Sequence, residues 1–320
     1  MKQRSYLLLP AAILSVFPTA LFAQEEPNWV DSQHHSIRTT LHDWANSLDG
    51  WIGDTDPNRP ASAGLRIMLD SEWNRYDRFS IKPRIRGKIK LPALKNKVSL
   101  VFGDDELDNE SRDKNRIGST YAVPLEKNKR YDRKQAREDN ASLALRWSET
   151  TKRLGIKTDI DVGVRAVNDI YLRFRAAKEW QLTENIRTRL EQIYRYGAKS
   201  KHYLRTNFEN NYAQNDQTFI ANHLHLQYTN DFDEERTSWG NSFYRQHDFA
   251  EYKRLNYGIY IGGNVKNKRF DLNQYGPFIT WRQPILRRWL FIQPELHYYN
   301  DKAQDRIHHL GAFLRLEAIF

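Results

Sequence analysis

Basic side chains occupy every second position from Lys82 to Lys90, within the segment 79–91, and such a row could guide anions through a polar channel. The five are Lys82, Arg84, Arg86, Lys88 and Lys90. Alternate side chains of a β-strand point to opposite faces, so all five would share one face. A basic wall in a narrow channel lowers the barrier for anions and raises it for cations. The same alternation places more basic side chains at Arg173, Arg175, Arg187 and Arg189.

These residues have a second interpretation, in which they pair with carboxylates of other strands and fill a closed interior. The acids expected on the same face are fewer than the basic residues, so we expect incomplete pairing and a residual preference for anions. The expected inward acids are Asp70, Glu72, Asp159, Asp161, Glu179, Glu191, Glu209, Glu295 and Glu317.

Histidines are the remaining candidates for chemistry. His223 and His225 share one face of a predicted strand, and His308 and His309 are adjacent. Two histidines at this spacing could hold a metal or act as a base, although scattered histidines on strands are usually polar lining. The chain has no cysteine, and we find no Ser/His/Asp setting and no glycine-rich phosphate loop. We therefore expect no catalysis, no metal site and no cofactor.

The elements that must position these residues are strands, because the periodicity is two from Ala63 onward. An even number of strands puts both ends of a barrel on one side. We expect an all-β fold, a single antiparallel barrel of about fourteen strands, with twelve also possible. The predicted strands are 63–74, 79–91, 96–103, 140–148, 153–166, 169–182, 185–197, 201–213, 217–229, 236–247, 252–263, 274–283, 288–300 and 307–320.

The last strand shows which solvent surrounds this barrel. Leu314, Leu316 and Phe320 lie on its apolar face, whereas Arg315 and Glu317 lie on the other. About ten residues suffice for a tilted strand to cross a bilayer, and an apolar outer face is expected where that solvent is lipid. We expect Leu314→Arg to be more damaging than a lumen change such as Arg315→Gln.

A final strand that ends on an aromatic residue resembles the assembly signal of Gram-negative outer-membrane β-barrel proteins, and the resemblance covers about 63–320. It implies an outer-membrane location, with membrane lipids and lipopolysaccharide around the barrel. It also implies periplasmic chaperones and the barrel-assembly machinery as partners. In this resemblance Leu314, Leu316 and Phe320 form the assembly signal.

Composition agrees with a barrel of this kind. Aromatic residues make up 13% of the 320 residues and charged residues 28%, and the mean hydropathy of −0.80 is too polar for a helical membrane protein. The net charge of +10 would suggest nucleic acid as a partner. Because the basic residues are spread over alternating strands, we expect no nucleic-acid binding.

The N-terminal part precedes the barrel. Residues 1–23 have the charge and apolar run of a signal peptide. Residues 24–62 form a periplasmic segment with an amphipathic helix at 32–53, and 63–320 form the barrel. The helix could be a plug, an interfacial anchor or a docking site, but packing across the barrel mouth is the favoured interpretation. The only long loop predicted, 104–139, is expected on the cell exterior.

The sequence favours a passive pore with a basic lumen for anionic or small polar solutes. A structural barrel with a closed, salt-bridged lumen that binds lipopolysaccharide or a partner is the alternative, and an enzyme is the least favoured.

Overall fold

A computed structural model describes residues 29–53, 60–94, 97–105, 131–166, 168–231 and 234–320. The predicted signal peptide, parts of the predicted periplasmic segment and most of the long loop lie outside these residues. No helix among the described residues is long and apolar enough to cross a membrane.

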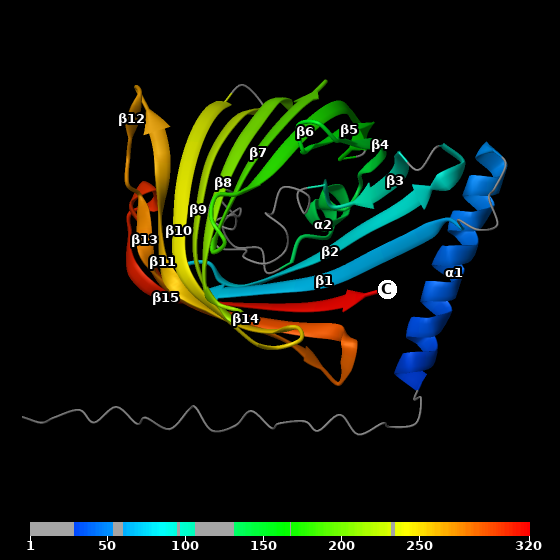
Figure 1. Ribbon diagram of the computed structural model, residues 1–320. Helices are drawn as coiled ribbons and strands as arrows, with labels where there is room; N and C mark the ends of the chain where they lie inside the picture. The colour runs from blue at the N-terminus through cyan, green and yellow to red at the C-terminus, as the bar shows by residue number, and fades with distance from the viewer. Residues whose placement is uncertain (1–28, 54–59, 95–96, 106–130, 167, 232–233) are drawn as a thin grey trace, which may run out of the picture.

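Fourteen antiparallel strands form a closed ring (Figure 1). Consecutive strands pair, β1 pairs with β15, and β10 pairs with β11. The barrel prediction is therefore confirmed, and the strand limits differ from the predicted ones by a few residues. A two-residue strand, β12 (Arg269–Phe270), adds only to the end of β11. The ring consists of β1 (Ser62–Asn74), β2 (Arg78–Leu91), β3 (Val98–Gly103), β4 (Leu143–Thr151), β5 (Ile156–Arg165), β6 (Asp169–Gln181), β7 (Ile186–Gly197), β8 (Lys201–Asn215), β9 (Thr218–Asp231), β10 (Glu234–Ala250), β11 (Lys253–Lys266), β13 (Gln274–Ile285), β14 (Arg287–Asp301) and β15 (Arg306–Ile319).

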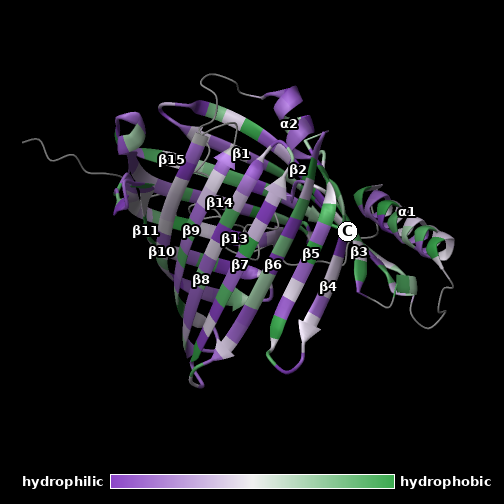
Figure 2. Ribbon diagram, turned by 90° about the horizontal axis from the view of Figure 1, so that it is seen from above, coloured by the Kyte–Doolittle hydropathy of each residue, from purple (hydrophilic) through white to green (hydrophobic). Residues whose placement is uncertain are grey.

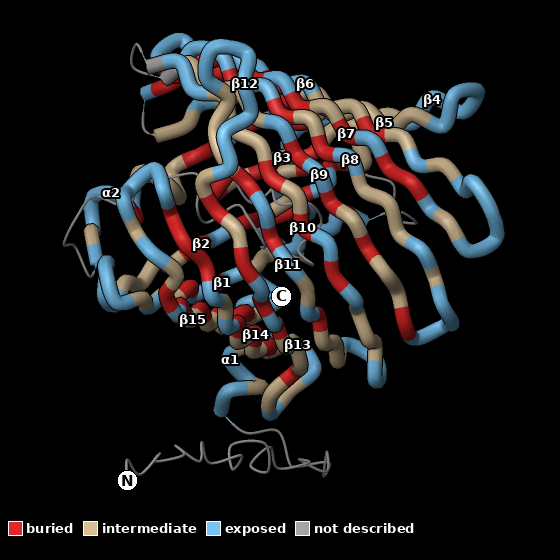
Figure 3. Tube along the Cα trace, turned by 90° about the vertical axis from the view of Figure 1, so that its left-hand side faces the viewer, coloured by how far each residue is buried: buried red, intermediate tan, exposed pale blue. Residues whose placement is uncertain are grey.

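The strands alternate between an apolar outer face and a polar inner face, as the bands of hydropathy and burial along them show (Figures 2 and 3). On β7, Arg189, Glu191 and Arg195 are buried inside, whereas Leu190 and Tyr194 are exposed outside. Exposed apolar side chains on an outer face are expected where the surrounding solvent is lipid. The inward face is consequently where polar chemistry can be placed.

One part of the wall is built without a full strand. Strand β3 pairs with β2 only from Arg86 toward the end of β2. Beyond that point the side chain of Asn140 replaces a strand, since its Oδ1 accepts from the Ile85 N–H at 2.6 Å and its Nδ2 donates to the Pro83 carbonyl at 2.9 Å. Asn140 directly follows helix α2 (Arg133–Asp139), so these two hydrogen bonds hold α2 against β2.

Helix α1 (Trp29–Ile52) lies on the outer wall, at the end of the barrel where the chain terminates (Figure 1). Its Ala45 and Leu48 pack with Ile89 and Leu91, two outward-facing residues at the end of β2. The prediction of a helix at 32–53 is confirmed, but packing across the mouth is wrong. The apolar ends of the outer wall offer the helix a better partner than the polar lumen does.

Candidate functional site in the barrel lumen

Buried arginines and carboxylates form a network across the inward faces of β15 and β1 to β8. The simplest unit crosses three neighbouring strands, because register places Asp161 of β5 between Arg146 of β4 and Arg173 of β6. Arg146 bonds both carboxylate oxygens of Asp161 at 2.7 Å, and Arg173 reaches the same group at 3.1 Å. Two guanidinium groups thus share one carboxylate.

The same sharing recurs on β6 and β7. Glu191 accepts hydrogen bonds from Arg175, at 2.7 Å, and from Arg189. Arg175 also reaches Asp159 at 2.6 Å, and Arg189 reaches Glu209 at 2.9 Å. The units are therefore linked into a ladder of charge-assisted hydrogen bonds, which are stronger than neutral ones.

The ladder continues over the junction between the first and last strands. Arg315 bonds both oxygens of Asp70 at 2.7 and 2.8 Å, with Arg84 3.6 Å from the same carboxylate. Glu317 is shared in the same way by Arg66 and Arg282, the latter at 2.6 Å. The sequence predicted Arg315 and Glu317 as inward side chains but did not predict their partners.

Two carboxylates of the network were missed because they come from a predicted loop. The chain turns at Gly103, whose φ of +94° favours glycine and where a Cβ would lie 2.1 Å from the Ile85 carbonyl oxygen. Asp104 then bonds Arg84 at 2.5 Å. Asp105 meets Arg195 at 3.0 Å and Arg165 at 3.3 Å. An acidic pair directly after a predicted strand was the only signal in the sequence.

The other part of the lumen, from β9 to β14, is mostly neutral. Tyr244, Tyr260, Phe278 and Tyr299 form a buried cluster with Ala221. His223 and His225 are buried nearby with ring centroids 6.0 Å apart. Among the described residues no group of three or more His, Cys, Asp or Glu side chains could hold a metal ion. His308 lies elsewhere, stacked on Tyr298 and edge-to-face with Tyr275.

Comparison with known proteins extends this description only at the level of the fold. No family model and no curated protein matches the chain. Solved structures do, among them an OmpT loop-deletion mutant from Vibrio cholerae, with 8% identity, a TM-score of 0.47 and coverage of 81% of this chain and 99% of that one. The outer-membrane channel DcaP of Acinetobacter baumannii has 7% identity, a TM-score of 0.44 and coverage of 84% and 99%.

A closed antiparallel barrel with an apolar exterior and a charged interior satisfies every backbone group within lipid. This chain has the architecture of a transmembrane β-barrel.

The predicted basic residues of this barrel fall into different surroundings. Arg84, Arg173, Arg175 and Arg189 belong to the network described above, and Arg86 is buried beside it. Lys82 pairs with Asp139 of α2 at 2.9 Å. Lys90 and Arg187 are exposed at strand ends. The basic ladder of β2 is therefore divided between an ion-paired part and an open part.

The open part of the row lines a hollow of about 310 Å³, which lies inside the end of the barrel where the chain terminates. Lys88 and Lys90 of β2 line it together with Lys97, which also pairs with Glu149 at 2.7 Å. The remaining lining residues are neutral: Pro60, Ser62, Pro92, Ser99 and Ser148. Ammonium groups beside serine hydroxyls suit a small anion such as phosphate or a carboxylate.

Proposed function

We propose that the barrel is a narrow passive passage across the outer membrane that favours small anionic or polar solutes. The observation that carries this proposal is the hollow with three lysines and no carboxylate in its lining. Basic charge at a low-dielectric mouth raises the local concentration of anions.

The arginines of the network are not the source of the anion preference in this proposal. Their ion pairs in the described lumen bring together ten arginines and ten carboxylates, so these charges cancel. The arginines are Arg66, Arg84, Arg146, Arg165, Arg173, Arg175, Arg189, Arg195, Arg282 and Arg315, and the acids are Asp70, Asp104, Asp105, Asp159, Asp161, Asp169, Glu179, Glu191, Glu209 and Glu317. Lys88, Lys90 and Lys97 line the hollow outside this set, and Lys97 pairs with Glu149 there, so we expect their basic charge to act at the mouth.

A structural barrel with a closed lumen is the second candidate, and the burial of the network favours it. Arg315 and Glu317 are each only 1% exposed, and Arg173 is 3% exposed. Side chains that line a wide aqueous channel would be more accessible. In the proposed passage the same burial limits transport to small solutes.

Recording from the refolded protein in planar bilayers separates the two candidates. If the barrel is a passage, we expect small unitary conductances in a potassium chloride gradient. The reversal potential should be displaced from zero toward the equilibrium potential of chloride. Heat-denatured protein in the same detergent is the control. Correctly folded protein that does not conduct would favour the structural barrel.

Partners implied by the resemblance, namely the barrel-assembly machinery, periplasmic chaperones and lipopolysaccharide, remain part of the proposal, as does cleavage after residue 23. The assembly role of Leu314, Leu316 and Phe320 also remains a prediction. In the structure Phe320 completes the barrel, since its N–H donates to the Leu65 carbonyl at 2.8 Å and its carbonyl accepts from Leu65 at 3.2 Å.

A further inference from the structure

Helix α1 carries an apolar line that the barrel does not cover. Val30, Ile37, Trp44 and Trp51 recur every seven residues, and seven residues are nearly two helical turns, so they lie along one line. Their exposed fractions are 39%, 37%, 62% and 86%. Two tryptophans this exposed are unusual on a surface that faces water.

The orientation of this line is fixed by contacts on the neighbouring face of the helix. Leu41, Ala45 and Leu48 lie toward the barrel, where Ala45 is completely buried. Further contacts fix the same orientation. Near the start of the helix Asp31 pairs with Arg287 at 2.7 Å, and His34 stacks on Trp289 with ring centroids 4.2 Å apart. Near its end Asn46 accepts from the Ala61 N–H at 3.1 Å, and Asp49 accepts from the Ala93 N–H at 3.0 Å. The helix is therefore held at both of its ends.

The helix also lies at the edge of the lipid-facing surface. It covers Ile89 and Leu91, the last two outward residues of β2. The outward residue Ile85 on the same strand, and Ile67 and Leu69 on β1, are exposed. Protein thus covers the ends of these strands, and the apolar line lies on the face of α1 next to the one that packs on them.

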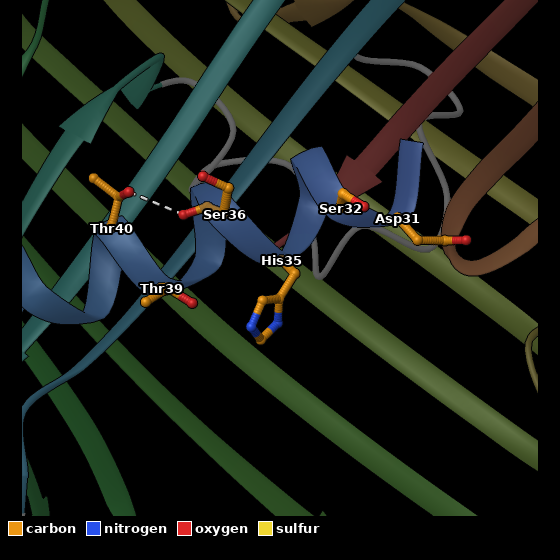
Figure 4. Close-up of a pocket in the computed structure, with 6 residues that line it drawn as sticks. All are labelled: Asp31, Ser32, His35, Ser36, Thr39 and Thr40. Carbon is orange, nitrogen blue, oxygen red and sulfur yellow. Dashed lines mark hydrogen bonds between the residues drawn. The ribbon is translucent and has the colours of Figure 1, made fainter. Parts of the chain in front are cut away.

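Most of the other side chains in the first half of α1 are polar, and one of them, Asp31, also reaches Arg287 of the barrel. Asp31, Ser32, His35, Ser36, Thr39 and Thr40 border a shallow hollow in which every lining residue comes from α1 (Figure 4). The only bond drawn between them, from the Thr40 hydroxyl to the Ser36 carbonyl, is internal to the helix. One face of one helix does not enclose a ligand, so this flank is a solvated surface.

We infer that α1 is an interfacial helix whose line Val30–Ile37–Trp44–Trp51 inserts into the adjacent membrane leaflet, with phospholipid as its occupant. A helix with one apolar and one polar flank lies in the plane of the interface. Tryptophan suits this depth because its ring is apolar and its N–H reaches the headgroups. The inference is independent of whether the lumen conducts.

The experiment uses the full-length protein, which has no cysteine, so a single introduced cysteine gives one labelling site. Trp44→Cys and Ile37→Cys sample the apolar line, whereas Asp43→Cys and Thr39→Cys are matched controls on the polar flank. Each variant carries an environment-sensitive fluorophore in phosphatidylcholine vesicles. Heat-modifiable migration in gels first establishes that each variant has folded.

We expect brominated acyl chains to quench the labels at positions 37 and 44 at least twofold more than those at 39 and 43. Aqueous iodide should give the reverse order. Equal iodide quenching at positions 43 and 44 would overturn the inference, because the apolar line would then face water. Protection of position 44 from both quenchers would also overturn it, since a protein partner rather than lipid would cover the line.

Discussion

Two groups of basic residues lie on the same inward face of β2 and have different surroundings. Arg84 is buried between Asp70 and Asp104. Lys88 and Lys90, a few residues along, line the open hollow. A buried guanidinium that is paired with carboxylates holds strands together, whereas an ammonium group near water attracts mobile ions. The alternation and the sign of the charge are the same in both groups, so the kind of basic side chain and its surroundings determine the role.

The difference between arginine and lysine accounts for this division. A planar guanidinium can bond two carboxylates at once, as Arg175 does with Asp159 and Glu191. An ammonium group is a compact charge that remains strongly hydrated, which suits the mouth. The comparison predicts large effects on stability in the network and effects on ion selectivity at the mouth.

The largest expected effect comes from Arg315→Gln. This change leaves the buried Asp70 without its bidentate partner, and breaking one side of a buried pair costs about 3–5 kcal/mol. Urea unfolding of the refolded protein in vesicles should show the loss. The double variant Asp70→Asn with Arg315→Gln serves as the control and should recover part of it. A loss below about 1 kcal/mol in the single variant would show that the network contributes little to the fold.

Leu314→Arg should be next in size and tests the outer wall beside the same residue. A cation on the lipid face costs about 2–4 kcal/mol near the bilayer midplane. From the sequence, Leu314→Arg was expected to destabilise the protein more than Arg315→Gln, because Arg315 was treated as an ordinary lumen residue. The structure reverses this order. Leu314→Val is the control and should be nearly neutral in the same unfolding experiment. If Leu314→Arg were neutral too, the assignment of the two faces would be wrong.

Alternation explains why the sequence predicted so much of the fold and less of the site. Period two determines which side chains face inward, so all fourteen strands and the inward position of Arg315 were predictable. It does not determine which inward residues contact each other. Those contacts depend on the register between strands and on loop residues that reach into the lumen. Asp104 and Asp105 were missed for this reason. The place of α1 was missed because its pattern shows an apolar face but not the surface that covers it.

A partly exposed ion pair should have a smaller effect than the buried ones. Arg306 bonds both oxygens of Asp77 in the turn after β1, at 2.6 and 2.8 Å. Burial alone would raise the pKa of Asp77, but hydrogen bonds from Arg306 and Asn74 hold it below the ordinary value of 3.8.

The pH dependence of this pair follows from the lowered pKa. Asp77 stabilises the protein above pH 3.8, its ordinary value, and this contribution is lost as pH falls through the lower pKa of the folded state. Unfolding measured against pH should show that Asp77→Asn is less stable than the parent near neutrality, by up to about 1 kcal/mol. The difference should vanish in strong acid. A difference that does not change with pH would exclude an ionic origin.

The smallest effect on stability is expected at the mouth. Lys90→Gln should change the free energy of unfolding by less than about 0.5 kcal/mol, because Lys90 is exposed. Thermal melting alongside Arg84→Gln would show the contrast directly. A loss in Lys90→Gln as large as that in Arg84→Gln would remove the distinction between the two groups.

The most direct test measures ion selectivity in the triple variant Lys88→Gln, Lys90→Gln, Lys97→Gln. Its control has the same change in net charge at exposed positions in turns and at a strand end, namely Lys152→Gln, Lys266→Gln and Lys268→Gln. In planar bilayers with a potassium chloride gradient, we expect the reversal potential of the hollow variant to shift toward zero. The control should keep the chloride preference of the parent. Equal shifts in both variants, or a chloride preference that survives in the hollow variant, would contradict the proposal that the lysine-lined mouth selects anions.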